Sequence, residues 1–578
     1  MRRALFCILY ILTVICAYGW NSALLTEQGT SLAYNADADG FVLPDFSHAG
    51  YCGADADIPD VPVVKTISPV SGDNTSHIQS AIDAIGQMSI VNGIRGALLL
   101  RAGRYEIRGT INVPYDGVVL RGEGIGQTVL YATGDSPHQR DVAVIGASTR
   151  IWGGEEKSGT RQYIQDAIVP VGAKTLTVTN GSAYRVGQQL IVYHPCTAEW
   201  LAAIDYGGVP YPDPSAPSDP DERWTANQYP ITYHRYIAAI SGNIITLDAP
   251  VFYTLRKNLS ASYVYEPQMS GTIYGSGIEN LSVEIQSTGG EDENHAWQAV
   301  RFRSVENAWA IDCEFSGFGQ SGIITEACRR STFLRCRAIN PVSITTGERK
   351  YCFNTYLNSQ LNLFKECYAH GGRHNYISNG TSGTSGNVFL RCVSDSALNV
   401  NEGHRAWTQA MLYDGHIDQN MVRPFTLGLY NRVAKGTGHG WAAVHSVLWN
   451  CDVGSNYGTI GLQKPPTAQN YAIGCRAKSI TGKPISDSNF TIGYIEGQNR
   501  SGLTPVSLYD AQLTARKSQT TALDEHLFLN AEWDSIPWEY LRVFTPDGQT
   551  ISAPYPNNGI FIVYGIYKGQ TYTKKIIR

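Results

Sequence analysis

The stretch Thr332-Phe333-Leu334-Arg335-Cys336 is one copy of a phrase that recurs along the middle of the chain, a few apolar or aromatic residues ending in cysteine. Six cysteines close this phrase: Cys313, Cys336, Cys367, Cys392, Cys451 and Cys475. Successive members are 23, 31, 25, 59 and 24 residues apart, so most intervals hold one repeating unit and the longest holds two. A repeat of roughly 25 residues is typical of a solenoid.

Each unit contains short runs rich in Val, Ile, Phe and Thr, separated by Gly, Asn and Ser. This pattern predicts strands joined by tight turns. Without helical periodicity, such a repeat predicts coils stacked so that their strands lie parallel, roughly 4.8 Å apart. We therefore expect an all-β fold, a right-handed parallel β-helix. Cysteine at a fixed phase of each coil then fills an internal column as a buried free thiol.

Composition bounds the possible partners of the chain. The 578 residues include 45 basic and 50 acidic side chains, a net charge of -5, so bulk charge does not favour a nucleic-acid partner. The length exceeds that of an ordinary single core, but a solenoid grows along its axis and escapes this limit. We expect a monomer.

The N-terminus has the pattern of a signal peptide over residues 1–19. Arg2 and Arg3 precede an apolar run that ends at Cys16, followed by a small-residue exit. A lipoprotein signal would need a small residue before Cys16, where Ile15 stands. No later segment has the length and apolarity of a membrane span, so we expect a secreted or cell-surface protein. In such an oxidising compartment, Cys52 and Cys196 are candidates for a disulfide.

The chain divides into a lead-in over 20–60, a β-helix over 61–495 and a further module over 500–578. Ile78, Ile82 and Ile85 follow helical spacing after an N-cap at Thr75 or Ser76, which predicts a helix that covers the first coil. A proline-rich and acidic insertion over 196–235 is either a cleft wall or a solvated loop. No cofactor is predicted; calcium is an alternative at acidic residues of this insertion. These residues are Asp213, Asp219, Asp221 and Glu222.

Three stretches carry a resemblance to a known group of proteins. Gly72-Asp73-Asn74-Thr75, the run from Leu99 to Tyr105 and Leu120-Arg121-Gly122-Glu123-Gly124 resemble the pectate-lyase-like superfamily of secreted β-helix proteins, over roughly residues 60–490. The resemblance implies a carbohydrate-active protein. It leaves the reaction open, because relatives include polysaccharide lyases and glycoside hydrolases.

The C-terminal module has a resemblance of its own. The runs Leu541 to Ile551, Gly559 to Tyr564 and Tyr572 to Arg578 resemble the second half of the β-sandwich sorting domain of the type IX secretion system. The resemblance implies outer-membrane secretion machinery as a partner. A plain β module is the alternative.

Basic residues concentrate in one part of the chain. Residues 329–439 contain 13 Lys and Arg against 6 Asp and Glu, which predicts a stripe that faces anions. Arginine binds carboxylates in a forked manner, so the stripe suits a polysaccharide that contains uronic acid. The residues expected to bind this substrate are Arg349, Lys350, Trp407 and Trp441.

Such a polymer can be cleaved by β-elimination. A cation neutralises the sugar carboxylate, a base removes the proton at C5, and an acid protonates the leaving oxygen. We expect Arg373 and Arg405 to neutralise the carboxylate and Tyr413 to act as the acid. The candidate bases are His374, His404 and His439, because imidazole titrates near neutral pH.

Two other functions remain open. Hydrolysis needs two carboxyl groups about 5 to 9 Å apart, for which Asp395, Glu402 and Asp414 are the candidates. A non-catalytic surface protein would use the basic stripe and its tryptophans to bind glycan. The stacked basic positions favour elimination by a small margin.

Overall fold

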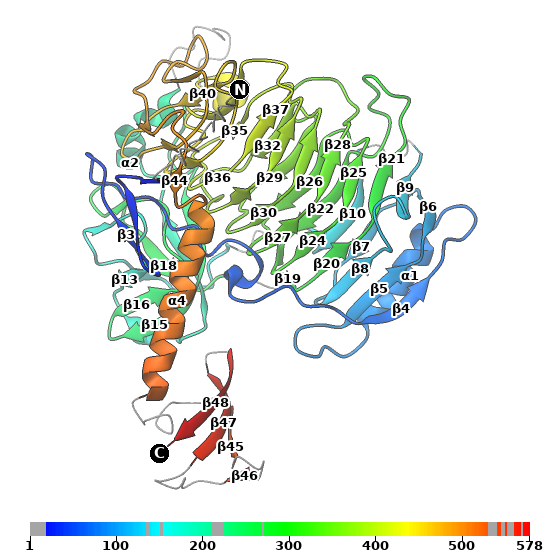
Figure 1. Cartoon of the computed structure of the whole chain (residues 1–578), viewed down its shortest axis with the longest axis horizontal. Coiled ribbons are helices and arrows are strands. Elements are labelled where there is room, and N and C mark those ends of the chain that lie inside the picture. Colours follow the sequence, from blue (N-terminus) through cyan, green and yellow to red (C-terminus); the bar gives the residue numbers. More distant parts are fainter. Residues whose placement is uncertain are drawn as a thin grey trace, which may run out of the picture. The chain divides into compact units, whose positions relative to one another are not determined.

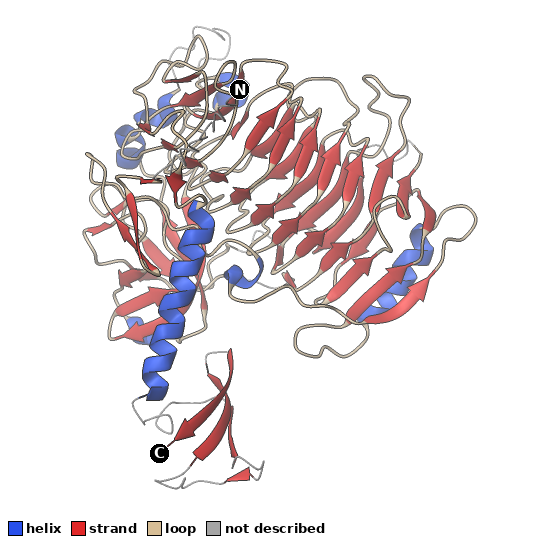
Figure 2. Cartoon of the chain, in the orientation of Figure 1, coloured by secondary structure: helices blue, strands red, loops and turns tan. Residues whose placement is uncertain are grey.

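The computed structural model describes residues 19–134, 139–150, 154–209, 223–268, 271–529, 540–544, 550–551, 560–567 and 570–577. Its main body is a parallel β-helix with three long sheets of ten, twelve and eight strands (Figures 1 and 2). Successive coils pair in register: Phe333 lies beside Ala310 of the preceding coil and Phe364 of the following one. The predicted solenoid is therefore confirmed.

The ten-stranded sheet consists of β7 (Ile111–Val113), β10 (Asp141–Gly146), β22 (Gln298–Arg303), β26 (Ser321–Glu326), β29 (Tyr351–Thr355), β32 (His374–Ser378), β35 (Asn401–Gly403), β38 (Phe425–Leu429), β40 (Thr459–Leu462) and β42 (Ser479–Thr481). The eight-stranded sheet consists of β6 (Gly103–Ile107), β9 (Thr128–Ala132), β21 (Ser282–Ile285), β25 (Glu314–Ser316), β28 (Arg337–Ile339), β31 (Tyr368–His370), β34 (Val393–Asp395) and β37 (Ile417–Gln419).

The twelve-stranded sheet consists of β4 (Val63–Ile67), β5 (Gly96–Leu100), β8 (Val118–Arg121), β20 (Gly277–Glu279), β24 (Trp309–Ile311), β27 (Thr332–Leu334), β30 (Leu363–Lys365), β33 (Val388–Leu390), β36 (Leu412–Asp414), β39 (Val447–Trp449), β41 (Tyr471–Ile473) and β43 (Tyr494–Glu496). Two further short strands, β19 (Ile273–Tyr274) and β23 (Val305–Glu306), pair in parallel and so join two successive coils.

The cysteine column lies inside the coils, at the corner between the twelve- and eight-stranded sheets. Each phrase is a strand, one residue with positive φ such as Arg335 (φ 50°), and then the buried thiol. The Sγ of Cys336 lies 3.5 Å from the carbonyl oxygen of Ala310 in the preceding coil. His416 stands at the cysteine position in the coil after Cys392, because Leu390 pairs with Asp414. The longest interval therefore does contain a further coil.

The predicted N-terminal helix is confirmed as α1 (Thr75–Gly86), which buries Ile78, Ile82 and Ile85 against the first coils. It begins one residue earlier than an N-cap at Thr75 would place it. The carboxylate of Asp73 accepts hydrogen bonds from the Thr75 backbone N–H (2.9 Å) and hydroxyl (2.6 Å), which satisfies a free N–H of the first turn.

The lead-in follows the solenoid along its length. β1 (Trp20–Asn21) pairs in parallel with β44 (Leu503–Thr504) beside the last coils. Farther on, the Gly50 N–H donates to the Leu361 carbonyl (2.8 Å), and β4 then pairs with β5 of the first coil. The segment also contains β2 (Leu25–Gln28), β3 (Ser31–Tyr34) and η1 (Tyr51–Ala54).

The interruption of the solenoid is wider than the sequence suggested at 196–235. β8, β9 and β10 pair directly with β20, β21 and β22, so the chain between β10 and β20 lies outside the coil sequence. It forms a six-stranded antiparallel sheet of β11 (Gln162–Tyr163), β13 (Thr175–Thr177), β14 (Gln189–His194), β15 (Ile231–Ser241), β16 (Ile244–Leu247) and β18 (Tyr263–Tyr265). Smaller elements complete it: β12 (Ile168–Val169), β17 (Leu255–Arg256), η2 (Gly181–Ala183), α2 (Ala198–Ala203) and η3 (Asp205–Gly208). Antiparallel strands share the apolar alternation of coil strands, so sequence alone did not separate them.

Two compact units make up the chain, and the second comprises residues 28–32 and 513–578. α4 (Leu508–Leu529) was not predicted. The described C-terminal strands β45 (Tyr540–Phe544), β46 (Thr550–Ile551), β47 (Ile560–Tyr567) and β48 (Gln570–Ile577) form one antiparallel sheet, and the second sheet of a sandwich is not among them. The sorting-domain resemblance stays a prediction. Residues 1–18 of the predicted signal peptide lie outside the described residues.

None of the helices in the described ranges combines the length and apolarity needed to cross a membrane. All ten cysteines in those ranges are free thiols, so the candidate Cys52–Cys196 disulfide is not formed. Cys196 is buried and its Sγ lies 3.6 Å from the Thr225 carbonyl oxygen.

The cysteine column makes a prediction about thiol reactivity. A chain that starts at residue 20 should show ten thiols to an aromatic disulfide reagent after denaturation without reductant. In the native state the partly exposed Cys52 should react first, because burial raises the pKa of thiols such as Cys328 (to about 12) and withholds them from the reagent. A total of eight after denaturation would contradict the assignment of every thiol as free.

Candidate functional site

A cluster of polar side chains lies on the outer side of the ten-stranded sheet, around β32 and β35. We call it the Glu402 cluster. Its members are Tyr351, His374, Glu402, His404, Tyr430, Arg432 and His439. Three of the predicted bases therefore lie together, around a carboxylate that was predicted as an acid or base of hydrolysis.

Glu402 is the centre of the cluster and is fully buried. It lies in β35, beside Ile377 of β32, and its side chain points away from the core. The carboxylate receives three donors: His404 Nδ1 at 2.6 Å, the Tyr430 hydroxyl at 2.5 Å and Arg432 Nη1 at 3.2 Å. These bonds compensate the cost of burying a charge and fix the imidazole of His404.

His374 has one ring nitrogen in use and one free. Its Nδ1 donates to the Val400 carbonyl at 2.5 Å, which leaves Nε2 as the acceptor nitrogen. Nε2 is buried and has no hydrogen-bond partner among the described residues. Burial is the main reason that the pKa of His374 is held well below its usual value, so the ring is neutral.

His404 and His439 are kept neutral in the same way. The two rings lie 4.9 Å apart, and Arg432 contacts both of them, at 3.1 Å from His439 Nδ1. Burial, followed by the positive charge of Arg432, lowers the pKa of His439 to about 3 and that of His404 well below its usual value. Because Nδ1 of His404 donates to Glu402, its Nε2 carries the lone pair and accepts a hydrogen bond from Arg432 Nη1 at 2.8 Å.

Three basic side chains lie at the partly exposed rim of the cluster: Lys350, Arg373 and Arg405. Arg373 Nη1 donates to the Tyr351 hydroxyl at 3.2 Å, and the charges of Arg373 and Arg405 both lower the pKa of His404. In the part of the chain that the structure describes, none of the three forms an ion pair with a carboxylate. The rim therefore carries uncompensated positive charge.

Most of the basic stripe is neutralised by neighbouring coils. Carboxylates one coil away bind Arg335, Arg337 and Arg391, and the insertion supplies Asp248 to Arg330. Arg349, predicted to bind substrate, is bonded to Glu293 at 2.5 Å and stacks on Trp297. Among the described residues, the basic side chains of the stripe without an ion pair are those of the rim, Lys365 and Arg423, which bonds only to Asn399.

Several predicted site residues lie elsewhere. Tyr413 is buried inside the coils, stacked on Phe389, with its hydroxyl 3.1 Å from the Tyr376 carbonyl oxygen. Its position in β36, a strand of the twelve-stranded sheet, turns it into the core. The expectation that Tyr413 protonates the leaving oxygen is therefore wrong in its geometry.

The three carboxylates proposed for hydrolysis lie on three different sheets. Asp395 is in β34 of the eight-stranded sheet and accepts from the Tyr368 hydroxyl at 2.8 Å. Asp414 is in β36 and accepts from the Tyr509 N–H and the Ser507 hydroxyl, both at 2.8 Å. Glu402 lies on the ten-stranded sheet, so no two of them form a catalytic pair.

Trp407 and Trp441 are not available to sugar rings. Trp407 is 0 % exposed and packs edge-on against Trp200, Trp224 and Tyr253 of the insertion. Trp441 is 1 % exposed and packs on Phe490. The insertion covers both residues, which sequence spacing alone could not reveal.

One set of side chains could hold a metal ion. His374, Glu402 and His404 offer ligand atoms within 4.8 Å of one another. Arg432 Nη1 contacts Glu402, His404 and His439, so a metal ion and this guanidinium would compete for the same acceptors. The acidic residues considered for calcium between 213 and 222 lie outside the described residues.

Sequence reasoning missed Tyr351, Tyr430 and Arg432. Tyr430 and Arg432 follow β38 as His404 follows β35, but their coil has no cysteine phrase of its own. Tyr351 is paired with His374 across adjacent strands. Its hydroxyl accepts from the Glu348 N–H (2.9 Å) and from Arg373, so its own proton is free to be donated.

Comparisons with known proteins give distant likenesses only. No protein-family model matches the chain, and no curated protein matches it by sequence. Among solved structures, ORF18 of Geobacillus virus E2 aligns with 10% identity and a TM-score of 0.34 over 76% of this chain and 60% of that one. The chain thus spans about three fifths of that protein.

Two enzymes align at the same level. The polygalacturonase from Erwinia carotovora ssp. carotovora has 12% identity and a TM-score of 0.37, over 76% of this chain and 98% of that one. The alginate lyase from Paenibacillus sp. str. FPU-7 has 9% identity and a TM-score of 0.34, over 75% of this chain and 100% of that one. No conclusion about substrate or reaction follows from similarities at this level.

The buried histidines predict acid sensitivity. Burial lowers the pKa of His194 and His445 to about 3. The unfolded chain binds a proton near pH 6.5 and the folded chain does not, so their stability contribution is full above that pH and is lost as the pH falls toward 3. Each histidine should lower the free energy of unfolding by about 1.4 kcal/mol for every pH unit that the pH falls within this window.

Urea midpoints measured from pH 7 to pH 4 check this. His445→Asn should flatten the loss of stability with acid, because asparagine tolerates the positive φ of this position (50°) and does not titrate. The control His77→Asn, at a partly exposed residue of α1, should leave the slope unchanged. Equal slopes of stability against pH in the unaltered protein and in both variants would contradict the low pKa of buried His445.

Proposed function

We propose that the protein cleaves a polysaccharide containing uronic acid by β-elimination at the Glu402 cluster. The observation that carries the proposal is the uncompensated positive charge at the rim, where Arg373 and Arg405 lie beside neutral imidazoles. Guanidinium groups without a protein carboxylate favour the entry of an anionic ligand. Fold alone does not imply this function.

In the proposed reaction, Arg373 and Arg405 bind the sugar carboxylate and so acidify the proton at C5. Arg432 Nη1, which lies 2.8 Å from Nε2 of His404, must first shift from this nitrogen. Nε2 of His404 then removes the proton at C5 while its Nδ1–H remains bonded to Glu402. The electron pair forms the C4=C5 double bond, and the C4–O bond breaks. The leaving oxygen takes the proton of Tyr351, whose hydroxyl oxygen already accepts two hydrogen bonds.

Substrate binding would also activate the base. Burial is the largest cause of the low pKa of His404 in the free protein, and the positive charges of Arg432, Arg373 and Arg405 lower it further. A bound carboxylate compensates part of that charge, so the pKa of His404 rises toward the working pH. The base is then stronger in the complex than in the free protein.

Hydrolysis has one supporting observation. Asp141 and Glu326 lie on the outer side of the ten-stranded sheet, and Arg301 binds both, at 2.9 Å and 3.3 Å. A hydrolase uses two carboxyl groups that can each reach the substrate, whereas Arg301 and Arg303 engage both of these carboxylates. Elimination is therefore the better supported reaction.

Arginine variants test the proposal on a panel of polygalacturonate, alginate and glucuronan. Arg405→Ala and Arg373→Ala should lower turnover by about a hundredfold or more, because the developing charge at the carboxylate loses its counterion. The matched control Arg476→Ala removes an exposed arginine paired with Asp452 and should be unaffected. Product is followed by the ultraviolet absorbance of the unsaturated sugar.

Reducing ends without that absorbance would identify a hydrolase, and binding without either product would identify a glycan-binding protein. Full activity in both arginine variants would remove them from the site.

The acid and base can be separated by variants of the cluster. His404→Ala should lower kcat by about 10² to 10⁴-fold. Tyr351→Phe should lower kcat on a natural substrate but much less on one with a better leaving group, since the acid matters less there. Tyr368→Phe, which removes a hydroxyl bonded to Asp395 on another sheet, is the control. An equal loss of kcat on both substrates in Tyr351→Phe would contradict its role as the acid.

A further inference from the structure

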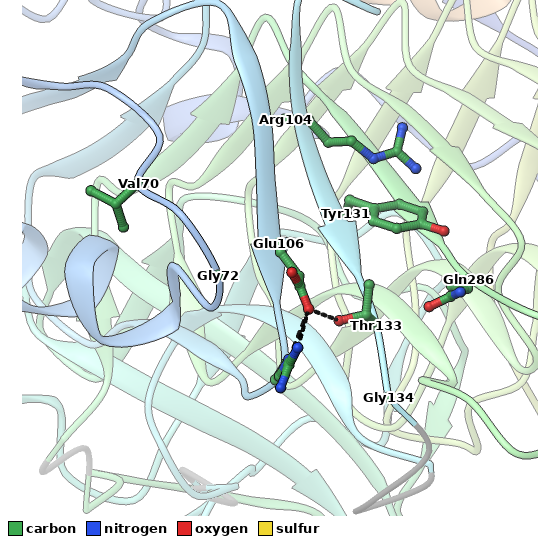
Figure 3. A pocket seen from close by; sticks show the side chains of 9 residues that line it. Val70, Gly72, Arg104, Glu106, Tyr131, Thr133, Gly134 and Gln286 are labelled. Carbon is green, nitrogen blue, oxygen red and sulfur yellow. Dashed lines mark hydrogen bonds and ion pairs between the residues drawn. The ribbon is translucent and has the colours of Figure 1, made fainter.

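Away from the Glu402 cluster, a polar hollow lies on the eight-stranded sheet, at the N-terminal end of the solenoid. It has a volume of about 620 Å³ and is lined by outward side chains of β6 and β9, by the turn before α1 and by Gln286 after β21 (Figure 3). A second hollow of about 410 Å³ shares Gly134 and Gln286 with it and extends to Asp292 and Asn294. Together they form a groove on the eight-stranded sheet, which we call the Tyr131 groove.

One wall of the groove is an aromatic ring with a guanidinium lying on it. The Arg104 guanidinium lies over the Tyr131 ring, with its carbon 3.4 Å from the ring centre (Figure 3). Arg104 Nη1 is also 3.3 Å from Glu284 Oε2. Tyr131 and Glu284 pair across adjacent strands, and so do Tyr131 and Glu106. Coil register therefore places an aromatic face, a planar cation and two carboxylates side by side.

The groove has both donors and acceptors available. Glu106 Oε1 accepts from Arg108 Nε (2.8 Å) and from the Thr133 hydroxyl (3.0 Å), which holds the carboxylate in place (Figure 3). Three polar groups of the groove have no hydrogen bond to the described part of the chain: Glu106 Oε2, the Tyr131 hydroxyl and the side-chain amide of Gln286. Planar carboxylate, amide and guanidinium groups suit vicinal sugar hydroxyls, which both donate and accept.

Charge distinguishes this groove from the Glu402 cluster. The two arginines, Arg104 and Arg108, are each paired with a carboxylate, and Asp292 adds a further negative charge at the far end. A uronate carboxylate would meet no unpaired positive charge in this groove, whereas it would meet such a charge at the rim of the Glu402 cluster. The ligand that fits is hydroxyl-rich and uncharged.

We propose that the Tyr131 groove is a non-catalytic binding site for a neutral oligosaccharide, with one sugar ring on Tyr131 and its hydroxyls on Glu106 and Gln286. Arg104 would move from the ring to its edge and remain near Glu284. The site lies on the eight-stranded sheet, so it would hold a neutral segment of glycan while the ten-stranded sheet acts on a charged one. This proposal does not depend on the reaction proposed above.

An array of neutral glycans, including cellohexaose, xylohexaose, mannohexaose and galactan fragments, tests the proposal on the full-length protein. We expect the protein to bind at least one of these glycans, with the affinity measured by calorimetry. Tyr131→Ala should weaken the affinity about tenfold, as expected for the loss of one packed aromatic contact. Gln286→Ala, at an exposed position that the fold does not need, should weaken it by about threefold, within the worth of one hydrogen bond.

Tyr368→Ala is the matched control. Tyr368 lies on the same sheet face under Arg337, 4.7 Å from its guanidinium, but does not line the groove. The Tyr368→Ala protein should bind the neutral glycan with the same affinity as the unaltered protein. Absence of binding to every neutral glycan, or equal affinity in the Tyr131 and Tyr368 variants, would overturn the proposal. Turnover of uronate oligomers should be unchanged in Tyr131→Ala, and a loss of turnover there would show that the groove belongs to the reaction site instead.

Discussion

Parallel pairing in register between successive coils is the constraint on which the rest of this structure depends. It sets residues of distant sequence position beside one another, as Phe333 beside Ala310 and Phe364. Inside, the register gives a column of thiols and stacked aromatic rings such as Phe333 on Phe364. Outside, it gives rows of side chains whose charges must be compensated by the next coil.

Charge compensation between coils separates structural arginines from functional ones. Arg335 and Arg337 each meet a carboxylate of the preceding coil at 2.7 Å, and such exposed pairs contribute little to stability. They do, however, cancel the positive potential along most of the solenoid. At the Glu402 cluster the carboxylate is buried among three cations, Arg373, Arg405 and Arg432, and the rim keeps its charge. In the Tyr131 groove, by contrast, both arginines are paired with carboxylates.

The cysteine phrase made the solenoid and the thiol column predictable, and the spacing of Ile78, Ile82 and Ile85 made the capping helix predictable, because each depends on local pattern. His374, His404 and His439 were expected on one stripe, although His404 follows its strand while His374 begins one. Glu402 was instead expected beside Asp395 and Asp414, which lie on other sheets. Tyr413 was misplaced for a different reason. Sequence gives the phase of a residue only to within one position, and a shift of one turns a side chain from the surface to the core.

The burial of Trp407 and Trp441 depended on the insertion, whose antiparallel strands read like coil strands in the sequence. Tyr430 and Arg432 were missed because their coil has no cysteine to mark its phase. Long-range packing of this kind, here Trp200 and Trp224 against Trp407, leaves no local signal.

The most direct test of the account is a crystal structure of the His404→Ala protein with a uronate oligosaccharide. The account predicts a sugar carboxylate within hydrogen-bonding distance of both Arg373 and Arg405, with C5 facing the vacated imidazole position. An oligosaccharide bound on the same sheet with its carboxylates turned away from these arginines, or bound at another sheet, would contradict it.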